Sequence, residues 1–279
     1  MTAPTPAMVV EIVRRALRED LGRGDITSQA VVPAAARGSG VVVARQAGVI
    51  AGLEVARMAF HEVDSRIEVS VLAADGDALP AGTALAEVAG YTRALLGAER
   101  TALNFLQRMS GIATLTRRYV DAVAGTTARI LDTRKTAPGL RCLDKWAVAL
   151  GGGANHRFGL FDGVLIKDNH LRPAGGIAAA VAAARADVPH GMKVQVEVET
   201  LAQVKEALER GADALLLDNM SRQDLRAAVE LARGRALTEA SGGVTLETVR
   251  AIAETGVDLI SVGALTHSAP ALDIALEIA

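Results

Sequence analysis

Four cationic side chains follow short apolar segments in the middle of the chain, and this arrangement could bind an anion. Arg134 and Lys135 follow the first segment, Lys167 follows the second, and Arg157 lies in the glycine-rich connection between them. If the two segments are neighbouring parallel strands, these cations share one edge of a sheet. Burying them together without a counter-charge would cost several kcal/mol per ion, whereas a single loop cation is simply solvated. Their repetition at strand ends favours a carboxylate or phosphate site, for which arginine adds bidentate geometry.

Two acidic residues end the next two apolar segments. Glu197 and Asp218 could hold Mg²⁺ among phosphate oxygens, because Mg²⁺ takes oxygen ligands and is often bound through one or two carboxylates. Alternatively, they form ion pairs with Lys135 and Lys167, and the two interpretations are compatible.

Glycine-rich segments follow the last two apolar segments, and a helix is expected to begin near Thr245. Backbone N–H groups at such positions, together with a helix start, can bind a phosphate, although most glycine pairs are only turns. The residues of the expected phosphate-binding segments are Ser241, Gly242, Gly243, Gly263 and Ala264.

Two histidines complete the candidate chemistry. His156 and His267 could act in acid–base chemistry or bind phosphate, but a structural role is the commoner fate of a single histidine. No His/Cys spacing matches a zinc site, and no dinucleotide or P-loop glycine motif occurs. The sequence therefore indicates neither zinc nor Rossmann-type chemistry.

These residues must be positioned by the elements around them, and from residue 128 onward short strands alternate with helices. Repeated βα units imply parallel strands with right-handed crossovers, and their chemistry belongs at the carboxyl ends of the strands. We therefore expect a (β/α) barrel, incomplete or atypical, with a doubly wound sheet as the alternative. The strands are expected at 128–131, 164–166, 194–198, 214–217, 236–239 and 259–262, and the helices near Leu140, Gly175, Leu201, Ser221 and Thr245.

The first part of the chain mixes helices and strands. Helical spacing of apolar residues covers 6–21, 53–63 and 92–123, with Gly97 and Gly111 as weak points in the last of these. An extended region is expected to open at Asp25, and strands at 40–44, 49–50, 67–72 and 84–88. We place a domain boundary near Ser110. The expected domains are 1–110, 111–268 and a C-terminal helix at 269–279.

Composition excludes several classes of protein. With a net charge of −2 and 3% aromatic residues, the 279-residue chain has neither a basic field nor stacking platforms for nucleic acid. Its single cysteine, Cys142, fits a packing role in a reducing compartment. We see no signal peptide and no membrane-spanning run, and we expect a soluble, cytoplasmic protein with no membrane partner.

At this point the motifs resemble those of the quinolinate phosphoribosyltransferase family, also called nicotinate-nucleotide pyrophosphorylase (carboxylating). The most specific are DTRKT, GGG-x-NHR and KDNH, in that order. The matching segments are EDLGRGDITS (19–28), AERTALNFLQRMSGIAT (98–114), DTRKTAPGLR (132–141), GGGANHR (151–157), LIKDNH (165–170), VEVET (196–200), LLLDN (215–219), EASGG (239–243) and VGALTH (262–267).

The resemblance implies a fold, a reaction and an assembly. The fold is an N-terminal α/β sandwich domain followed by an atypical (β/α) barrel of about six or seven strands, with the last segment returning to the first domain. Quinolinate and phosphoribosyl pyrophosphate (PRPP) would give nicotinate mononucleotide, pyrophosphate and CO2, with Mg²⁺ as cofactor. The enzyme would work as a homodimer, or a multiple of dimers, with active sites shared between subunits.

The resemblance also implies roles for individual residues. Catalytic residues would be Lys135, Lys167, Glu197 and Asp218, with the two acids meeting the ribose hydroxyls and Mg²⁺–pyrophosphate. Glu197 is chosen over Glu199, which shares its face of the strand. The implied substrate-binding set is Arg100 from the partner subunit, Thr133, Arg134, Lys135, His156, Arg157, Lys167, Glu197, Asp218, Ser241, Gly242, Gly243, Val262, Gly263, Ala264 and His267.

Three alternatives stay open. The nearest is a related pyrophosphorylase paralogue that acts on another anionic aromatic substrate. The second is a phosphate-binding barrel lyase that uses Lys135 or Lys167 as a Schiff base. The third is a non-catalytic barrel that senses an anionic metabolite, in which Glu197 and Asp218 would have no purpose. Two or more cations facing a dicarboxylate favour quinolinate.

Overall fold

The computed structural model describes residues 3–278 and divides them into two compact units. The first unit contains residues up to 117, together with 136–152 and the segment from 265 onward. The second contains residues 118–135 and 153–264. The predicted boundary near Ser110 falls inside the long helix α4 (Thr92–Ala122).

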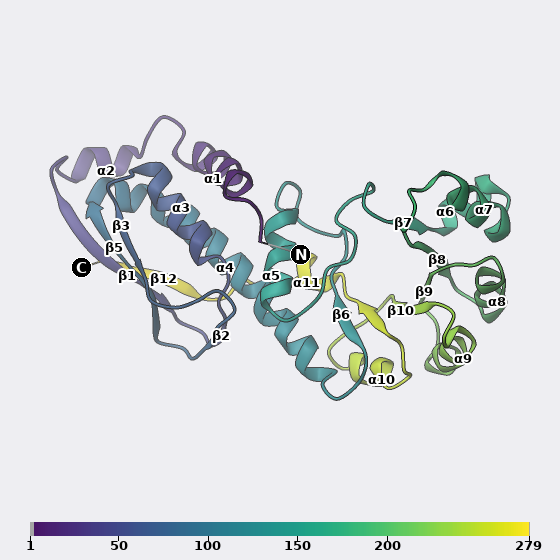
Figure 1. Ribbon diagram of the computed structural model, residues 1–279. Helices are drawn as coiled ribbons and strands as arrows, with labels where there is room; N and C mark the ends of the chain where they lie inside the picture. Colours follow the sequence, from purple (N-terminus) through teal and green to yellow (C-terminus); the bar gives the residue numbers. More distant parts are fainter. Residues whose placement is uncertain (1–2, 279) are drawn as a thin grey trace. The chain divides into compact units, whose positions relative to one another are not determined.

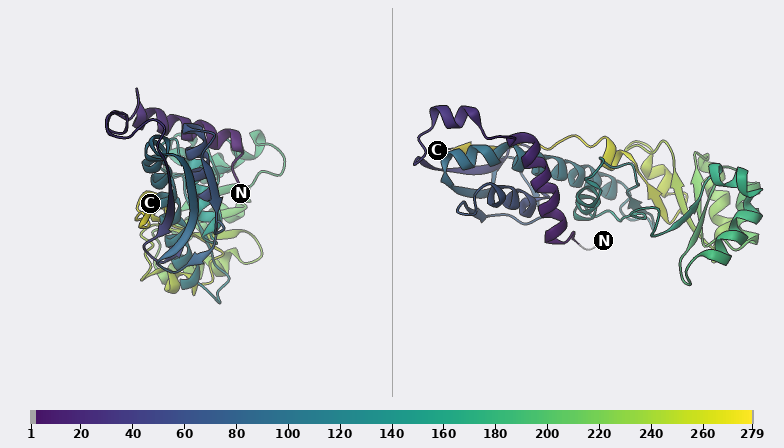
Figure 2. Two further views of the ribbon diagram at one scale, coloured as in Figure 1. Left: turned by 90° about the vertical axis from the view of Figure 1, so that its left-hand side faces the viewer. Right: turned by 90° about the horizontal axis from the view of Figure 1, so that it is seen from above.

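The first unit is built on a four-stranded antiparallel sheet in the order β12-β1-β5-β3 (Figures 1 and 2). A two-stranded ribbon, β2-β4, accompanies it, and α1 packs against α3. Its strands are β1 (Arg37–Ala44), β2 (Gly48–Val49), β3 (Glu68–Val71), β4 (Ala78–Leu79), β5 (Thr83–Tyr91) and β12 (Ile274–Ile278). Its helices are α1 (Pro6–Leu21), α2 (Ile26–Val31), α3 (Leu53–Val63), most of α4, α5 (Arg141–Leu150) and most of the short α11 (Ala264–His267).

The second unit is a six-stranded parallel sheet in the order β6-β11-β10-β9-β8-β7. Helices α7, α8 and α9 lie on the outer side of its strands (Figure 1). The strands are β6 (Arg129–Leu131), β7 (Val164–Ile166), β8 (Val194–Val198), β9 (Ala214–Asp218), β10 (Leu237–Ser241) and β11 (Leu259–Ser261). The helices are α6 (Asp168–Ala174), α7 (Ile177–Asp187), α8 (Leu201–Glu209), α9 (Arg222–Ala232) and α10 (Val249–Ala253).

The strand order selects the barrel over the doubly wound alternative. The first strand of the unit, β6, pairs with the last, β11, and the order then runs back through the chain without reversing. A doubly wound sheet instead reverses its order in the middle. Within the described residues no strand pairing joins β6 to β7, so the ring of strands is open there. The predicted fold class, an N-terminal α/β domain plus an atypical (β/α) barrel of about six or seven strands, is confirmed, with six strands in the sheet.

Burial explains why the barrel strands could be predicted from the sequence. All residues of β8 and β9 are buried or half-buried, as parallel strands covered on both faces must be. Such strands read as short, nearly continuous apolar runs. The polar exceptions within them are Gln195, Glu197 and Asp218.

Helix α4 runs without a break through both glycines that looked like weak points. A side chain at Gly111 would collide with the backbone of Pro270 and Ala271, so glycine there permits the close approach of the returning chain. Close packing, rather than a helix end, accounts for this glycine.

Two local expectations are wrong. Asp25 does not open an extended region; it caps helix α2, with its side chain accepting from the Ser28 backbone N–H. The helix that follows β10 begins at Val249 rather than near Thr245. The helix expected near Gly175 is present as α7, and an additional short helix, α6, begins directly after Lys167.

The C-terminal helix expected at 269–279 is also wrong over the described residues. Residues 274–278 form β12, which pairs antiparallel with β1 from Gly40↔Ile278 to Ala44↔Ile274. Leu, Ala and Glu favour helices by propensity, but Leu272, Ile274, Leu276 and Ile278 alternate with period two. A free strand edge on β1 lets this alternation prevail.

None of the helices in the described part of the chain combines the length and the apolar character needed to cross a membrane.

Candidate functional site

The carboxyl ends of the barrel strands bring predicted site residues onto one face of the sheet. The register pairs Glu197 with Leu216 and Asp218 with Ser241, and side chains two positions apart share a face. Lys167 follows β7 at the same edge, and its Nζ lies 2.6 Å from Glu197 Oε2. The ion pair predicted for Glu197 is therefore present with Lys167. Glu197 is only 11% exposed, so it lies in the sheet edge rather than in solvent.

The glycine-rich connection is attached to β6 by a buried carboxylate. Asp132 is fully buried, and its two oxygens accept from the His156 backbone N–H at 2.8 Å and from Asn155 Nδ2 at 2.6 Å. A parallel bridge between Leu131 and Ala154 continues this attachment along the open edge of β6. A buried carboxylate needs such donors. Asp132 therefore fixes the direction of the Asn155 side chain and of the His156 backbone. The motif was recognised in the sequence, but this positioning role of its first residue was not.

Arg134 and Arg157, two of the four predicted cations, lie close enough to affect each other. Burial lowers the pKa of the Arg157 guanidinium, and the positive charge of Arg134 lowers it further, while Asp162 acts in the opposite direction. Arg157 Nη1 donates to the Gly163 carbonyl at 2.8 Å, and its buried Nε has no hydrogen-bond partner within the described chain. Two guanidinium groups that repel each other, one with an unused buried donor, suit a bound anion.

Lys135 lies on the exposed segment that follows β6. Its backbone N–H donates to Thr133 Oγ1 at 3.0 Å, which forms a tight turn directly after the strand. Thr133 thus shapes the segment that presents the lysine.

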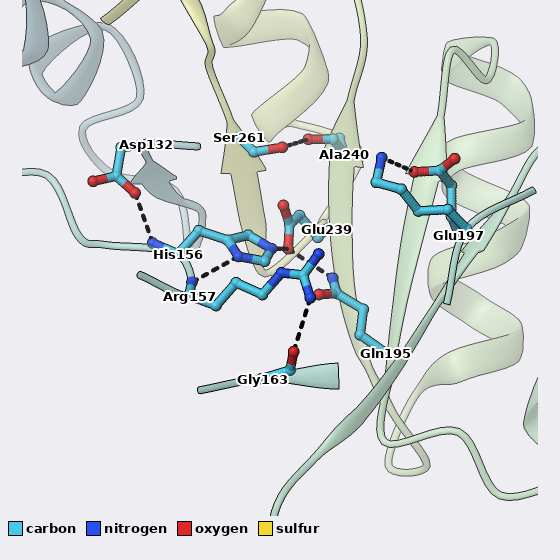
Figure 3. Close-up of polar contacts among 10 residues, drawn as sticks. Asp132, His156, Arg157, Gly163, Gln195, Glu197, Glu239, Ala240 and Ser261 are labelled. Carbon is cyan, nitrogen blue, oxygen red and sulfur yellow. Dashed lines mark hydrogen bonds and ion pairs between the residues drawn. The ribbon is translucent and has the colours of Figure 1, made fainter. Parts of the chain in front are cut away.

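A buried polar cluster lies beside Arg157, and part of it was not anticipated from the sequence (Figure 3). Glu239 on β10 is 2% exposed, and its Oε2 accepts from Gln195 Nε2 at 2.7 Å and lies 3.5 Å from His156 Nε2. Burial alone would raise the pKa of Glu239, but His156, Gln195 and Ser261 outweigh it, and the pKa falls below its ordinary value. Glu239 and Gln195 were missed because the sequence does not distinguish a buried polar residue within a strand from one that faces solvent.

The glycine segment after β10 has the backbone that only glycine adopts easily. Gly242 has φ 93° and Gly243 has φ 58°, and a side chain at Gly242 would collide with that of Asn219. Asn219 itself is left-handed at φ 51°, and its Nδ2 donates to Asp218 Oδ2 at 2.9 Å. The ends of β9 and β10 are thus packed closely, with Asn219 against Gly242, while Gly242 and Gly243 themselves stay exposed.

Val262, Gly263 and Ala264 follow β11 in the same unit. The Val262 side chain is 1% exposed and its backbone N–H donates to the Leu131 carbonyl at 2.9 Å, so it belongs to the core beneath the edge. Gly263 and Ala264 are half-buried.

Arg100 and His267 belong to the first unit. Arg100 is exposed on α4, and His267 is exposed at the end of α11, where its Nδ1 lies 2.6 Å from Ser268 Oγ.

Within residues 3–278, no group of three or more His, Cys, Asp or Glu side chains is arranged to hold a metal ion. A metal at Glu197 and Asp218 would therefore take most of its ligands from elsewhere, which fits Mg²⁺ bound to a phosphorylated substrate.

Comparison with known proteins agrees with this architecture. Family models described as "Quinolinate phosphoribosyl transferase, N-terminal domain" and "C-terminal domain" match residues 25–110 and 112–277. A relative from Arabidopsis thaliana, "Nicotinate-nucleotide pyrophosphorylase [carboxylating], chloroplastic", is 47% identical, over 96% of this chain and 82% of its own. A Bacillus subtilis protein named "Probable nicotinate-nucleotide pyrophosphorylase [carboxylating]" is 44% identical, over 93% of this chain and 90% of its own.

A solved structure has the same fold along nearly the whole chain. The nicotinate-nucleotide pyrophosphorylase from Francisella tularensis superposes with a TM-score of 0.92 at 39% identity, covering 99% of this chain and 98% of that one. The chain belongs to the quinolinate phosphoribosyltransferase family.

Proposed function

We propose that this member of the quinolinate phosphoribosyltransferase family transfers the phosphoribosyl group of PRPP to quinolinate with decarboxylation. The products are nicotinate mononucleotide, pyrophosphate and CO2, and the reaction belongs to NAD biosynthesis. Family membership and the names of the relatives support the reaction. The observation that carries the substrate assignment is the mutual repulsion of Arg134 and Arg157 beside an unused buried guanidinium donor.

Quinolinate is a dianion, and its two carboxylates match two neighbouring guanidinium groups. Arg134 and Arg157 form this clamp, and Arg100 of the partner subunit completes it. Binding the dianion replaces repulsion between the arginines with attraction, and each guanidinium can form paired hydrogen bonds with a carboxylate. Nicotinate has one carboxylate and would leave part of this charge unmatched.

PRPP binds at the neighbouring strand ends. The exposed backbone at Gly242 and Gly243 receives the 5′-phosphate, together with Gly263 and Ala264. Glu197 and Asp218 accept from the ribose hydroxyls, and the same two carboxylates would hold Mg²⁺. The bound Mg²⁺ supplies positive charge at the pyrophosphate.

The chain's own residues then account for the transfer. Lys135 and Lys167 stabilise the negative charge that develops on the departing pyrophosphate as C1 of the ribose becomes cationic. The carboxylate clamp holds the pyridine nitrogen close to C1, so that attack occurs over a short, fixed distance. The positive charge of the resulting pyridinium stabilises the electron pair left on C2 when the 2-carboxylate leaves as CO2, and C2 then takes up a proton from water. No nucleophilic side chain is required.

The active enzyme is proposed to be a homodimer, or a multiple of dimers, in the cytoplasm. The exposed position of Arg100 on α4 supports its donation to a second copy. The chain's single cysteine, buried at Cys142, fits a reducing compartment.

Product analysis tests the reaction. The purified protein is mixed with PRPP and Mg²⁺ plus either quinolinate or nicotinate, and a third tube contains quinolinate and excess EDTA. Nicotinate mononucleotide and CO2 are expected from quinolinate alone, and EDTA should abolish them. Product from nicotinate but not from quinolinate would overturn the carboxylate clamp. Full turnover in EDTA would overturn the role of Mg²⁺. No product from either acid would favour the paralogue interpretation.

A further inference from the structure

We infer that Glu239 is a positioning residue of the carboxylate clamp: it holds the His156 imidazole in the tautomer protonated at Nε2, and His156 in turn holds the backbone of Arg157. The inference deepens the proposed function, because Arg157 is one of the two arginines assigned to the dianion.

Burying the charged Glu239 carboxylate costs enough free energy that its position needs an explanation. It lies in the middle of β10, is 2% exposed, and has its pKa lowered, so it carries its charge inside the sheet. Removing a carboxylate from water costs several kcal/mol unless hydrogen bonds compensate. Its Oε2 accepts from Gln195 Nε2 at 2.7 Å and faces His156 Nε2 at 3.5 Å. The charge is thus directed at two side chains, one from β8 and one from the connection that precedes β7.

The other ring nitrogen of His156 decides the tautomer. The Arg157 backbone N–H lies 2.7 Å from His156 Nδ1 and points toward it. A backbone N–H can only donate, so Nδ1 must be free of hydrogen. The ring hydrogen is then on Nε2, on the side of Glu239. A carboxylate on one ring nitrogen commonly sets what the other nitrogen does.

This arrangement gives His156 a positioning role beside the substrate binding that the family resemblance implies. Both ring nitrogens face protein groups, the Arg157 backbone N–H at Nδ1 and Glu239 Oε2 at Nε2. Its backbone N–H is also held, by Asp132 at 2.8 Å. The ring therefore acts as a rigid link between the β10 carboxylate and the Arg157 main chain (Figure 3). Arg157 is held at its other end by the Gly163 carbonyl.

Replacing Glu239 with Gln isolates the charge. Glu239→Gln keeps the volume but leaves one neutral amide oxygen for which the Gln195 amide and the His156 Nε2–H must compete. We expect the KM for quinolinate to rise about tenfold or more, with kcat and the KM for PRPP changed by no more than about threefold. The matched control, Glu254→Gln, removes an exposed carboxylate that pairs only with Arg250 within the described chain, and should match the wild type.

A spectroscopic measurement separates positioning from a general effect on stability. In ¹⁵N-histidine-labelled wild-type protein at neutral pH, one-bond and long-range ¹H–¹⁵N spectra report the tautomer of each of the five histidines. The His156 signals are those missing in His156→Gln. We expect hydrogen on Nε2 alone in the wild type, and a shifted or mixed state in Glu239→Gln.

Two outcomes would overturn the inference. A wild-type His156 with hydrogen on Nδ1 would do so, and this result needs no variant to fold. A folded Glu239→Gln protein with an unchanged His156 spectrum and an unchanged KM for quinolinate would do so as well. Failure of the proposed function is distinguishable, because wild-type protein would then yield no nicotinate mononucleotide whatever its His156 spectrum.

Discussion

At the residue scale, Lys167–Glu197 differs from the ordinary surface ion pairs of this chain. Arg233–Glu230 joins side chains that are 71% and 65% exposed, and such pairs contribute at most about 1 kcal/mol. Glu197 is only 11% exposed, at the carboxyl end of a barrel strand. Water does not solvate a carboxylate at this position well. The Lys167 ammonium at 2.6 Å compensates for the lost solvation. Both residues therefore hold charge ready at the edge where PRPP is proposed to bind.

Lys135 provides the sharpest residue-scale prediction. Lys135→Ala should lower turnover by orders of magnitude, because the side chain is assigned to charge that develops only in the transition state. The circular dichroism spectrum and the melting temperature should stay those of the wild type, since the residue is exposed. Steady-state kinetics with quinolinate and PRPP measure the effect.

Lys205→Ala is the control, because it removes an exposed lysine from α8. Near-wild-type turnover in folded Lys135→Ala would refute the catalytic role.

At the scale of elements, a bidentate ion pair ties several segments of the first unit together. Arg108 on α4 meets the fully buried Asp144 on α5 at 2.9 and 2.8 Å, and also donates to the Thr266 carbonyl at 3.1 Å. Asp144 accepts in addition from the Ala137 backbone N–H at 3.0 Å. One carboxylate thus joins α4, α5 and the segment at Ala137, which lies two residues after Lys135.

Asp144→Ala should cost about 3–5 kcal/mol of unfolding free energy, because Arg108 and the Ala137 N–H both lose a buried partner. Urea unfolding at neutral pH measures the change. Glu254→Ala, which breaks the exposed Arg250 pair, should cost less than about 1 kcal/mol. Equal losses in the two variants would show that Asp144 does not tie these segments together.

At the scale of the whole molecule, the first unit is discontinuous in sequence. The chain leaves the barrel unit soon after β6 to form 136–152, and again after β11 to form the segment from 265 onward. The last segment contributes β12, which completes the four-stranded sheet at the edge of β1. Both excursions start at carboxyl ends of barrel strands, so the connections between the units begin where the site lies.

Mixing two inactive variants tests whether the site is shared between subunits. If Arg100 acts in the partner's site and Lys135 in its own, a mixed dimer of Arg100→Ala and Lys135→Ala has one complete site. After unfolding and refolding an equal mixture, turnover should recover to about one quarter of wild type, because half the dimers are mixed. Each variant refolded alone is the control. No recovery in mixed dimers, confirmed by differential tagging and light scattering, would place Arg100 outside the partner's site.

Much of the barrel and its strand ends could be predicted from the sequence, because their signals are local. A buried parallel strand is a short apolar run wherever it occurs, and 164–166 and 194–198 were predicted at the observed bounds. The polar residues that end such runs must meet at one edge, so Lys167 beside Glu197 was predictable without coordinates. The helix at 6–21 could likewise be predicted from its apolar spacing.

Tertiary structure decided what depends on partners distant in the sequence. The residues at 274–278 became a strand because β1 offered an edge, which outweighed their helical propensity. Glu239 and Gln195 are 44 positions apart, and only the strand order that places β8 and β10 on either side of β9 brings their side chains together. Residue type and spacing thus determined which side chains end the barrel strands and what chemistry they offer, because the apolar runs that mark those strands reflect local burial. Which carboxylate holds which ring was decided by packing, because a buried polar group is defined by the neighbours that compensate its lost water.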